Sequence, residues 1–369
     1  MVFFGRAVLP VAILLTLALP ACAQFNWGTA TPESQGMSTS KLNSMQRTLQ
    51  SRGTTHFLVI RNDKIIYEWY APGHSRTTKH STASMAKALV GGVSLALALD
   101  DGLIALDDLA IKYVPQWNHI SLKKDIKVRH LGSHISGMAN ADQGDSGWES
   151  EFWKRKPPPN DPFTISRDKA PILFLAPGTG YQYSNPGTAM LTYCVTASLR
   201  NAPIKDIWTL LRDRIMRPIG VPDAEWSCGY EQTFTVDGLP LVPSWGGGNY
   251  SPNATARVAR LMLKGGTWEG KELISAPAVQ AITTDARTPG NVAQGWWTNS
   301  DRRADTLPAD AFWGTGAGHQ VVLVVPSLNL IAVRNGEDLD PSNPDVALQK
   351  YFFAPLMAAV TTSQTSKGP

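Results

Sequence analysis

Cysteine is scarce in this sequence of 369 residues, which contains only three. Cys22 lies in an N-terminal apolar segment, and Cys194 and Cys228 form no Cys-x-x-Cys motif. The seven histidines show neither an HExxH motif nor any other metal-ligand spacing. We therefore expect no metal and no cofactor. We expect Cys194 and Cys228 to be two buried free thiols, and a disulfide between them in an oxidising compartment is the alternative.

The sequence also has little excess charge of either sign. Its 34 Lys and Arg residues nearly balance 30 Asp and Glu residues, which gives a formal net charge of +4. Because the basic residues are dispersed, the composition does not favour binding to nucleic acid or to an anionic membrane surface. There is no internal repeat and no low-complexity tract. The length is sufficient for one large domain or two intertwined ones.

One apolar run lies at the N-terminus. Within residues 1–23 the only charge is Arg6, an apolar run extends from Ala7 to Leu19, and alanine flanks Cys22 on both sides. This pattern is typical of a secretory signal peptide, and the run is short for a membrane span. We expect a periplasmic or secreted mature chain, residues 24–369, without a membrane span. An uncleaved anchor, or a lipid anchor on Cys22, is the alternative.

Strand patterns occur near both ends of the chain, and helical patterns lie between them. Two hairpins are predicted, one from His56–Ile60 with Ile65–Tyr70 and one from Gln320–Pro326 with Leu328–Gly336. The predicted helices are Ser38–Gly53, Ser84–Asp100, Ala254–Lys264 and Pro344–Val360. The pattern predicts an α+β fold, in which helices flank an antiparallel β-sheet built from both termini and a mostly helical region is inserted.

This reading places one domain over residues 24–369. Its sheet part covers about 24–80 and 300–369, and its helical part covers about 81–299. Trp148–Asp161, which contains three consecutive prolines, is predicted to be a surface loop, and a binding flap is the alternative.

Four Ser-x-x-Lys tetrads occur, and only their context separates them. They are Ser38–Lys41, Ser84–Lys87, Ser121–Lys124 and Ser166–Lys169. Only Ser84 begins a helix that is apolar nearly all round, and such a helix is buried. Lys87 then lies one turn further on the same face, where burial would lower its pKa and make it a usable base. The alternative is a helix cap beside a lysine that extends to solvent.

Two further segments carry chemistry-bearing residues. Tyr183-Ser184-Asn185 offers a phenol for proton transfer and an amide that can orient a lysine or a substrate. Its alternative is a simple turn before a helix. The glycine-rich segment Gly314–Gln320 leads into a strand, where free backbone N–H groups could bind an oxyanion. A plain tight turn is the alternative there.

Taken together, these segments resemble the serine β-lactamase-related family of Ser-x-x-Lys acyl-enzyme hydrolases, which includes class C β-lactamases and penicillin-binding proteins. The resemblance covers nearly the whole mature chain. It rests on the segments HSTASMAKALVGG, RHLGSHISGM, PGTGYQYSNPGTAML, WGGGNYSPNATARVARLMLKGG and FWGTGAGHQVVLVVPSLNLIAVRNG.

The resemblance implies roles for individual residues. Ser84 would be acylated, with Lys87 and Tyr183 as candidates for the base. Asn185 would hold Lys87 and the substrate. Substrate would lie along a strand through Gly316 and Gly318, and the backbone N–H groups of Ser84 and His319 would form the oxyanion hole.

One departure from the family pattern concerns substrate choice. Many relatives carry Lys-Thr-Gly or His-x-Gly on this strand, whereas the matching triplet here is Gly316-Ala317-Gly318. The missing cation favours the esterase and 6-aminohexanoate-dimer-hydrolase-like branch, which acts on carboxylic esters or small amides. Arg302 or Arg303 could supply a replacement charge. The alternatives are a D,D-peptidase, a β-lactamase, or a non-hydrolytic penicillin- or peptidoglycan-binding sensor.

Several aromatic and histidine side chains have two readings. Trp296, Trp297 and Trp313 either belong to the core or wall an acyl pocket. His130 and His134 are expected to be structural hydrogen-bonding groups rather than general bases.

Overall fold

The computed structural model describes residues 1, 25–142, 146–174, 176–284 and 289–361. The predicted signal peptide, apart from Met1, and Cys22 lie outside these residues. The described chain has an α+β fold with one seven-stranded sheet, which confirms the predicted fold class. In spatial order its strands are β1 (Gly28–Thr29), β3 (Lys64–Tyr70), β2 (Thr54–Arg61), β14 (Leu330–Gly336), β13 (Gln320–Val325), β12 (Phe312–Gly316) and β11 (Trp297–Thr298).

The sheet joins the two ends of the sequence at its centre. β2 pairs with β14, so that Arg61 lies opposite Leu330 and His56 opposite Asn335. Both predicted hairpins are present, β2–β3 and β13–β14. The sheet is antiparallel except at one edge, where β1 pairs parallel to β3.

Both faces of the central strands are buried, which explains their nearly continuous apolar sequences. Side chains alternate between the faces of a strand, and in β13 Val322 and Val324 enter one core cluster while Val321 and Leu323 enter the other. The first cluster lies between the sheet and the helical region. The second lies between the sheet and the helices formed by the chain ends.

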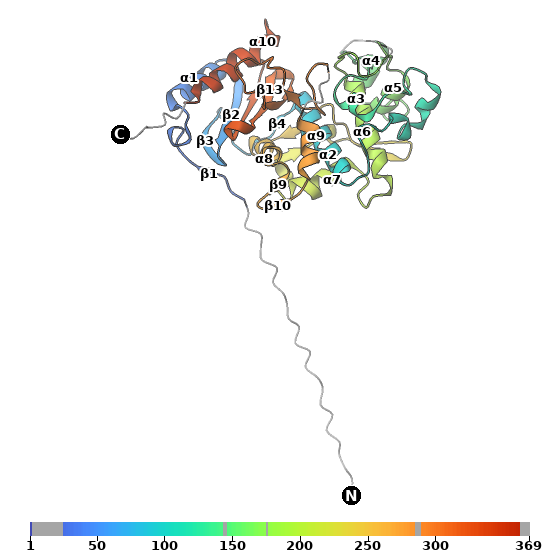
Figure 1. Ribbon diagram of the computed structural model, residues 1–369, viewed down its shortest axis with the longest axis horizontal. Helices are drawn as coiled ribbons and strands as arrows, with labels where there is room; N and C mark the ends of the chain where they lie inside the picture. Colours follow the sequence, from blue (N-terminus) through green and yellow to red (C-terminus); the bar gives the residue numbers. More distant parts are fainter. Residues whose placement is uncertain (2–24, 143–145, 175, 285–288, 362–369) are drawn as a thin grey trace.

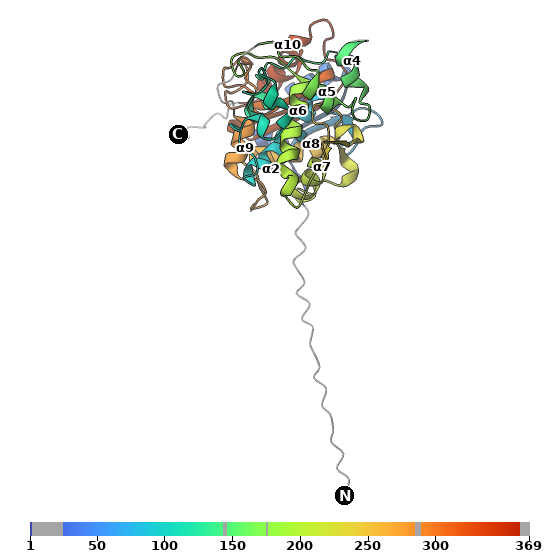
Figure 2. The same ribbon diagram turned by 90° about the vertical axis from the view of Figure 1, so that its right-hand side faces the viewer.

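Helices cover the two faces of the sheet in separate groups. In Figure 1, α1 and α10 lie on the outer face of the sheet, and α3 to α6 lie on the far side of α2, α8 and α9. Figure 2 views the molecule from the side of α4, α5 and α6. The helices are α1 (Thr39–Gln50), α2 (Val93–Asp100), α3 (Val128–Gly132), α4 (Gly147–Lys154), α5 (Pro162–Asp168), α6 (Asn185–Ser198), α7 (Ile207–Leu211), α8 (Pro252–Leu263), α9 (Ala276–Thr283), α10 (Pro344–Leu348) and α11 (Ala354–Ala359).

Short strands complete the fold. The three-stranded group is β4 (His80–Ser81), β8 (Asn249–Tyr250) and β5 (Trp226–Ser227). The two-stranded pairs are β6 (Phe234–Val236) with β7 (Leu239–Leu241), and β9 (Thr267–Trp268) with β10 (Lys271–Glu272).

The predicted apolar helix runs through the middle of the molecule. It begins with a 3₁₀ turn at Ala83–Met85, continues through a π-helical stretch at Lys87–Gly92 and ends as α2. By length and composition Ala83–Asp100 would suffice to cross a membrane, but 78% of it is buried inside the protein. Its apolar surface is therefore used in the core.

The structure corrects one local prediction and confirms another. The first half of Trp148–Asp161 is not a loop, because α4 extends to Lys154 and buries Phe152. Asp161 is the N-cap of α5 and accepts hydrogen bonds from the backbone N–H groups of Phe163 and Thr164. Cys194 and Cys228 are both buried free thiols, as expected.

Candidate active site

Ser84 lies on a strained turn between β4 and the buried helix. The preceding residue, Ala83, has a φ of 45°, a left-handed conformation that is costly for a residue with a Cβ. Such strain persists only where the surroundings impose it, and it concentrates at functional sites. Here the turn presents the Ser84 side chain to a cleft while the next residue, Met85, enters the core.

Lys87 lies one turn after Ser84 with its side chain almost fully buried, at 4% exposure. Its Nζ lies 3.2 Å from Ser84 Oγ, and it donates hydrogen bonds to Asn185 Oδ1 and to the carbonyl of Trp245, both at 2.7 Å. Burial lowers the pKa of Lys87 well below its usual value. None of the three partner atoms belongs to a carboxylate, so nothing among them opposes that effect.

These contacts suit the neutral amine. A neutral Nζ has two hydrogens and one lone pair. The two hydrogens can be donated to Asn185 Oδ1 and the Trp245 carbonyl, which leaves the lone pair for the hydroxyl of Ser84. Lys87 can therefore accept the Ser84 proton.

Tyr183 contacts the same hydroxyl from the other side. Its OH donates a hydrogen bond of 2.8 Å to Ser84 Oγ. Burial raises the pKa of Tyr183 to about 12, so the phenol is protonated at neutral pH. In this state it can supply or relay a proton.

Asn185 begins α6, and a second asparagine fixes its orientation. Asn140 Oδ1 accepts from both the backbone N–H and the Nδ2 of Asn185, at 3.0 and 3.1 Å. Because Nδ2 is held there, Oδ1 faces Lys87. Ser184 caps the helix, since its Oγ accepts from the backbone N–H of Gly187.

The end of β12 packs directly against the Ser84 turn. A Cβ placed on Gly316 would lie 2.3 Å from the carbonyl oxygen of Thr82, 2.8 Å from the backbone nitrogen of Ser84 and 2.9 Å from that of Met85. All three are backbone atoms that a rotamer change cannot move. Only glycine therefore permits this close approach.

Two cavities meet at Ser84. One, of about 300 Å³, is lined by Ser84, Lys87, His134, Tyr183, Val292, Gly295, Trp297, Thr315, Gly316 and Ala317. The other, of about 340 Å³, is lined by Ala83, Ser84, Asn140, Ala141, Asp142, Trp153, Tyr183, Asn185, Tyr230, Trp245, Gly246 and Ala317. Both contain Ser84, Tyr183 and Ala317. A substrate can thus extend to both sides of the nucleophile.

The structure brings together Ser84, Lys87, Tyr183, Asn185 and Gly316 but not the last two predicted residues. Gly318 and His319 line neither cavity at Ser84. The His319 ring contacts the Pro344 carbonyl and the Leu339 N–H instead.

The reason is the course of the backbone after β12. Left-handed conformations at Gly318 and His319 turn the chain into β13, away from the cleft. Ala317, the residue next to Gly316, lies at the cleft in their place.

The structure also decides between the two interpretations of the tryptophans and shows the hydrogen bonds of the two histidines. Trp296 and Trp313 are core residues, and only Trp297 lines a cavity at Ser84. His130 and His134 each accept a hydrogen bond from a backbone N–H through Nδ1. Burial lowers their pKa values to about 4 and about 3, as suits neutral structural histidines.

The other Ser-x-x-Lys pairs have ordinary structural roles. Ser38 caps α1, and Ser121 and Lys124 are exposed. Ser166 Oγ donates to the Pro162 carbonyl, while Lys169 pairs with Glu151.

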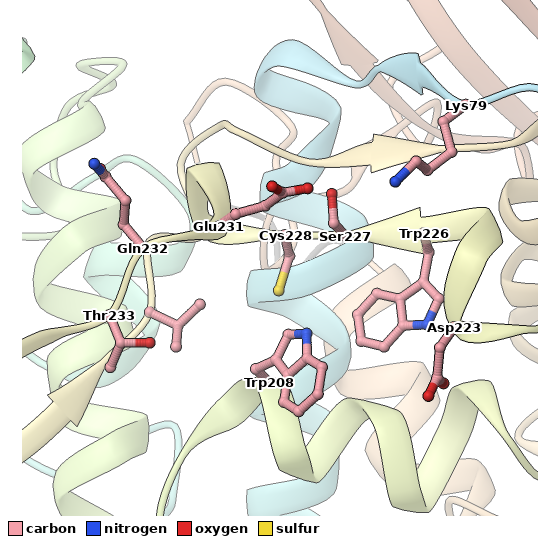
Figure 3. Close-up of a pocket in the computed structure, with 10 residues that line it drawn as sticks. Lys79, Trp208, Asp223, Trp226, Ser227, Cys228, Glu231, Gln232 and Thr233 are labelled. Carbon is pink, nitrogen blue, oxygen red and sulfur yellow. The ribbon is translucent and has the colours of Figure 1, made fainter.

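A larger cavity, of about 390 Å³, lies beside β5 and contains a different serine, Ser227. Figure 3 shows Trp208 rising from α7 towards the strand that carries Trp226 and Ser227. Within the described part of the chain Ser227 Oγ has no hydrogen-bond partner. Without a bonded base this hydroxyl is not activated, so the cleft at Ser84 is the better candidate for an active site.

Sequence reasoning missed three contributors to the site. Asn140 lies in a loop without any helical or strand periodicity, and the Trp245 carbonyl is a backbone group that any residue could supply. Ala317 had one usable signal, its place in the Gly316-Ala317-Gly318 triplet that matches the Lys-Thr-Gly segment of relatives.

Comparisons with known proteins agree with this geometry. A family model described as Beta-lactamase matches residues 43–349. A 6-aminohexanoate-dimer hydrolase from Paenarthrobacter ureafaciens is 24% identical over 324 residues, which cover 82% of this chain and 77% of that protein.

Solved structures show the same fold at low sequence identity. A family VIII carboxylesterase has a TM-score of 0.66 at 17% identity, with 90% of this chain and 98% of that chain covered. A penicillin-binding protein homologue from Caulobacter crescentus has a TM-score of 0.62 at 16% identity, with 87% and 99% covered.

Proposed function

The chain belongs to the beta-lactamase family, and we propose that it is an exported serine hydrolase that cleaves carboxylic esters or small amides through an acyl-enzyme at Ser84. One observation carries the proposal. Ser84 Oγ lies within hydrogen-bonding distance of both Lys87 Nζ, at 3.2 Å, and the Tyr183 hydroxyl, at 2.8 Å. A nucleophile beside two groups that can move its proton is the arrangement that acyl transfer requires.

In the acylation step, neutral Lys87 accepts the proton from Ser84 Oγ, which attacks the substrate carbonyl carbon. The carbonyl oxygen takes the negative charge of the tetrahedral intermediate. The backbone N–H groups of Ser84 and Ala317 stabilise it, which replaces His319 in the predicted oxyanion hole. When the intermediate collapses, the bond to the alcohol or amine breaks, and the leaving group takes a proton from Tyr183, which Lys87 replenishes.

In the deacylation step, a water molecule replaces the leaving group. Neutral Lys87 accepts a proton from this water, directly or by relay through the Tyr183 hydroxyl, as the water oxygen attacks the acyl carbon. The second tetrahedral intermediate collapses, Ser84 regains its proton, and the carboxylic acid leaves. Both steps use the same N–H groups, so one site serves the whole cycle.

The side chains around the cleft favour esters and small amides over carboxylate-bearing substrates. Among the described residues that line the two cavities at Ser84, Lys87 is the only lysine or arginine, and it is committed to Ser84. The lining otherwise supplies aromatic surface from Trp153, Tyr230 and Trp297. The relative from Paenarthrobacter ureafaciens supports the amide part of the proposal by its description.

Replacement of the nucleophile tests the proposal. Ser84→Ala should abolish labelling by a fluorophosphonate probe and lower nitrophenyl ester turnover by about 10³-fold or more. Ser121→Ala, from an exposed Ser-x-x-Lys pair, is the matched control and should keep wild-type turnover. Equal turnover by wild type and Ser84→Ala would refute the assignment, and a wild type that binds a penicillin without turnover would favour a sensor.

Export is a separate part of the proposal. The signal pattern places the start of the mature chain near Gln24. Expression of the full chain in a bacterial host, followed by fractionation and intact-mass measurement, should find a periplasmic or secreted product that begins there. A lipid-modified Cys22, or an uncleaved chain in the membrane, would contradict it.

A further inference from the structure

The turn that follows Gly316 is held in an unfavourable backbone conformation. Gly318 has a φ of 75° and His319 a φ of 53°. The left-handed region is uncommon for a residue with a Cβ, and a strained turn relaxes unless neighbouring groups restrain it. Ala317, which faces Ser84, begins this turn. The position of its N–H group therefore depends on whatever holds the turn.

Gln320 holds the turn from within. This side chain is buried, at 4% exposure. Its Nε2 contacts three carbonyl oxygens, those of Ala317 and Gly318 at 3.2 Å and that of Gly336 at 2.6 Å. Its Oε1 accepts from the backbone N–H of Gly336 at 3.1 Å. One amide thus ties the turn to the end of β14.

Arg334 holds the same turn from behind. It lies on β14 and is fully buried. Its Nη1 donates to the carbonyls of Gly318 and His319, at 2.5 and 3.1 Å. The rest of the guanidinium is fixed by Thr54 Oγ1 and the Glu337 carbonyl.

Burial of the Arg334 guanidinium has a large energetic cost. Taking a charge out of water costs several kcal/mol unless hydrogen bonds compensate. Within the described part of the chain, the hydrogen-bond partners of Arg334 are backbone carbonyls and one hydroxyl, and no carboxylate lies among them. Burial lowers the pKa of Arg334 to about 10, so it still carries its charge at neutral pH. Nη1 of this charged group is therefore aimed at the turn, while Nε and Nη2 anchor the guanidinium to Thr54 and Glu337.

We propose that Gln320 and Arg334 are positioning residues that fix the Ala317 N–H group at the oxyanion site by clamping the carbonyls of the turn behind it. The inference rests on the proposed function. Neither residue lines a cavity at Ser84, so neither contacts the substrate. Their effect is on the transition state, because the negative charge on the carbonyl oxygen develops only there. Loss of the clamp lowers kcat and leaves KM nearly unchanged.

The first test is Gln320→Glu in the mature full-length chain. This change keeps an oxygen for the Gly336 N–H but replaces the donor with a group that repels the carbonyls of the turn. We expect kcat for a nitrophenyl ester to fall by about 10²- to 10³-fold, the size of effect seen on loss of one oxyanion donor, with KM within about threefold. Gln46→Glu, a buried glutamine on α1, is the matched control and should keep wild-type kcat.

The second test is Arg334→Lys, which keeps the charge but cannot span the same set of acceptors. It should lower kcat in the same way, by about tenfold or more. The amide resonance of Ala317 should shift in both variants, while the melting temperature of Gln320→Glu stays near that of Gln46→Glu.

The outcomes separate the two proposals. An active wild type whose Gln320→Glu and Arg334→Lys variants keep kcat, or lose only substrate affinity, overturns the clamp and leaves the proposed function standing. If kcat falls equally in Gln320→Glu and in the control Gln46→Glu, the proposed clamp is also overturned. A wild type that turns over no ester or amide overturns the proposed function, and the catalytic role of the clamp falls with it. If Arg334→Lys fails to fold, Gln320→Glu still decides.

Discussion

Lys87 is surrounded by neutral acceptors, and this single environment sets how the site should respond to pH. No ion pair involving Lys87 occurs among the described residues, and burial lowers its pKa well below the usual value. The sequence predicted this environment, because the apolar residues after Ser84 indicated a buried helix. The family resemblance also implied Asn185 as a partner of Lys87, but the sequence could not predict the Trp245 carbonyl, because this backbone group comes close only after the chain has folded.

The pH dependence of kcat/KM should report the proton on Lys87. Only the neutral amine is a base, so kcat/KM should rise with pH until Lys87 is deprotonated, below the ordinary pKa of a lysine. Lys87→Arg should remove this rise and lower kcat/KM by about 10³-fold or more. Lys123→Arg is the control, because burial also lowers the pKa of Lys123, to about 8, but it lies outside the site. If Lys123→Arg lost the rise of kcat/KM with pH, the rise would belong to Lys123 and not to Lys87.

Asn140 is the residue-scale feature that the sequence did not reveal. Asn140→Ala removes the acceptor for two N–H groups of Asn185, so the amide of Asn185 is free to rotate and present Nδ2 to Lys87. We expect kcat/KM to fall by about 10- to 100-fold. Asn140→Asp keeps an acceptor oxygen and should retain more activity than Asn140→Ala. The reverse order, measured on the same ester, would contradict this role.

At the scale of elements, the contact between β12 and the Ser84 turn leaves no room for a side chain. Gly316→Ala places a methyl group within 2.9 Å of three backbone atoms, so the strand or the turn must shift. A displacement of about 1 Å at a catalytic group can lower the rate about 10²-fold. Gly28→Ala, in β1, meets only the Lys64 side chain at 3.6 Å and should leave kcat/KM unchanged. Equal kcat/KM for wild type and Gly316→Ala would show that the close approach is dispensable.

The same strand should determine the ranking of substrates. It offers no cation, and a hydrogen bond from a charged group is worth about 1.5–3 kcal/mol. A nitrophenyl ester should therefore be hydrolysed at least about tenfold more efficiently than a chromogenic cephalosporin, compared by kcat/KM on one preparation. Arg302 and Arg303 are exposed, and Arg303 pairs with Asp301. Cephalosporin turnover that equals ester turnover would restore the β-lactamase alternative.

The long elements could be predicted from the sequence, and the short ones could not. Apolar periodicity indicated the hairpins and the helices at α1, α8 and the chain end, because each has a face that must be buried. The prolines in Trp148–Asp161 led to a loop prediction over α4, because the eight residues of this helix are too few and too mixed to show a period. The family resemblance implied a place for His319 at the cleft, and this was wrong because spacing alone does not reveal the left-handed turn at Gly318.

At the scale of the whole molecule, buried neutral histidines should make the fold sensitive to acid. Burial lowers the pKa values of His56 and His134 to about 3, whereas the unfolded chain has the ordinary value near 6.5. The contribution of these two histidines to the free energy of unfolding is complete above pH 6.5. It is lost as the pH falls, because only the unfolded state takes up the protons. At pH 5 the loss is about 2 kcal/mol for each residue.

Thermal unfolding measured between pH 8 and pH 5 checks this expectation. The melting temperature of the wild type should fall across this range, and His56→Gln should show a shallower fall. His119→Gln is the control, because this side chain is exposed, and it should follow the wild type. Identical slopes in all three proteins would show that these histidines do not govern acid sensitivity.

The central position of β14 determines how early the sheet can fold during synthesis of the chain. β2 lies next to β14 in the sheet, yet Arg61 and its partner Leu330 are about 270 residues apart in the chain. Contacts between such distant residues form late and slowly. While the ribosome is still adding the last tenth of the chain, β2 lacks a neighbour on one side and the core cannot close. The central sheet therefore cannot be completed until almost all of these residues have been synthesised.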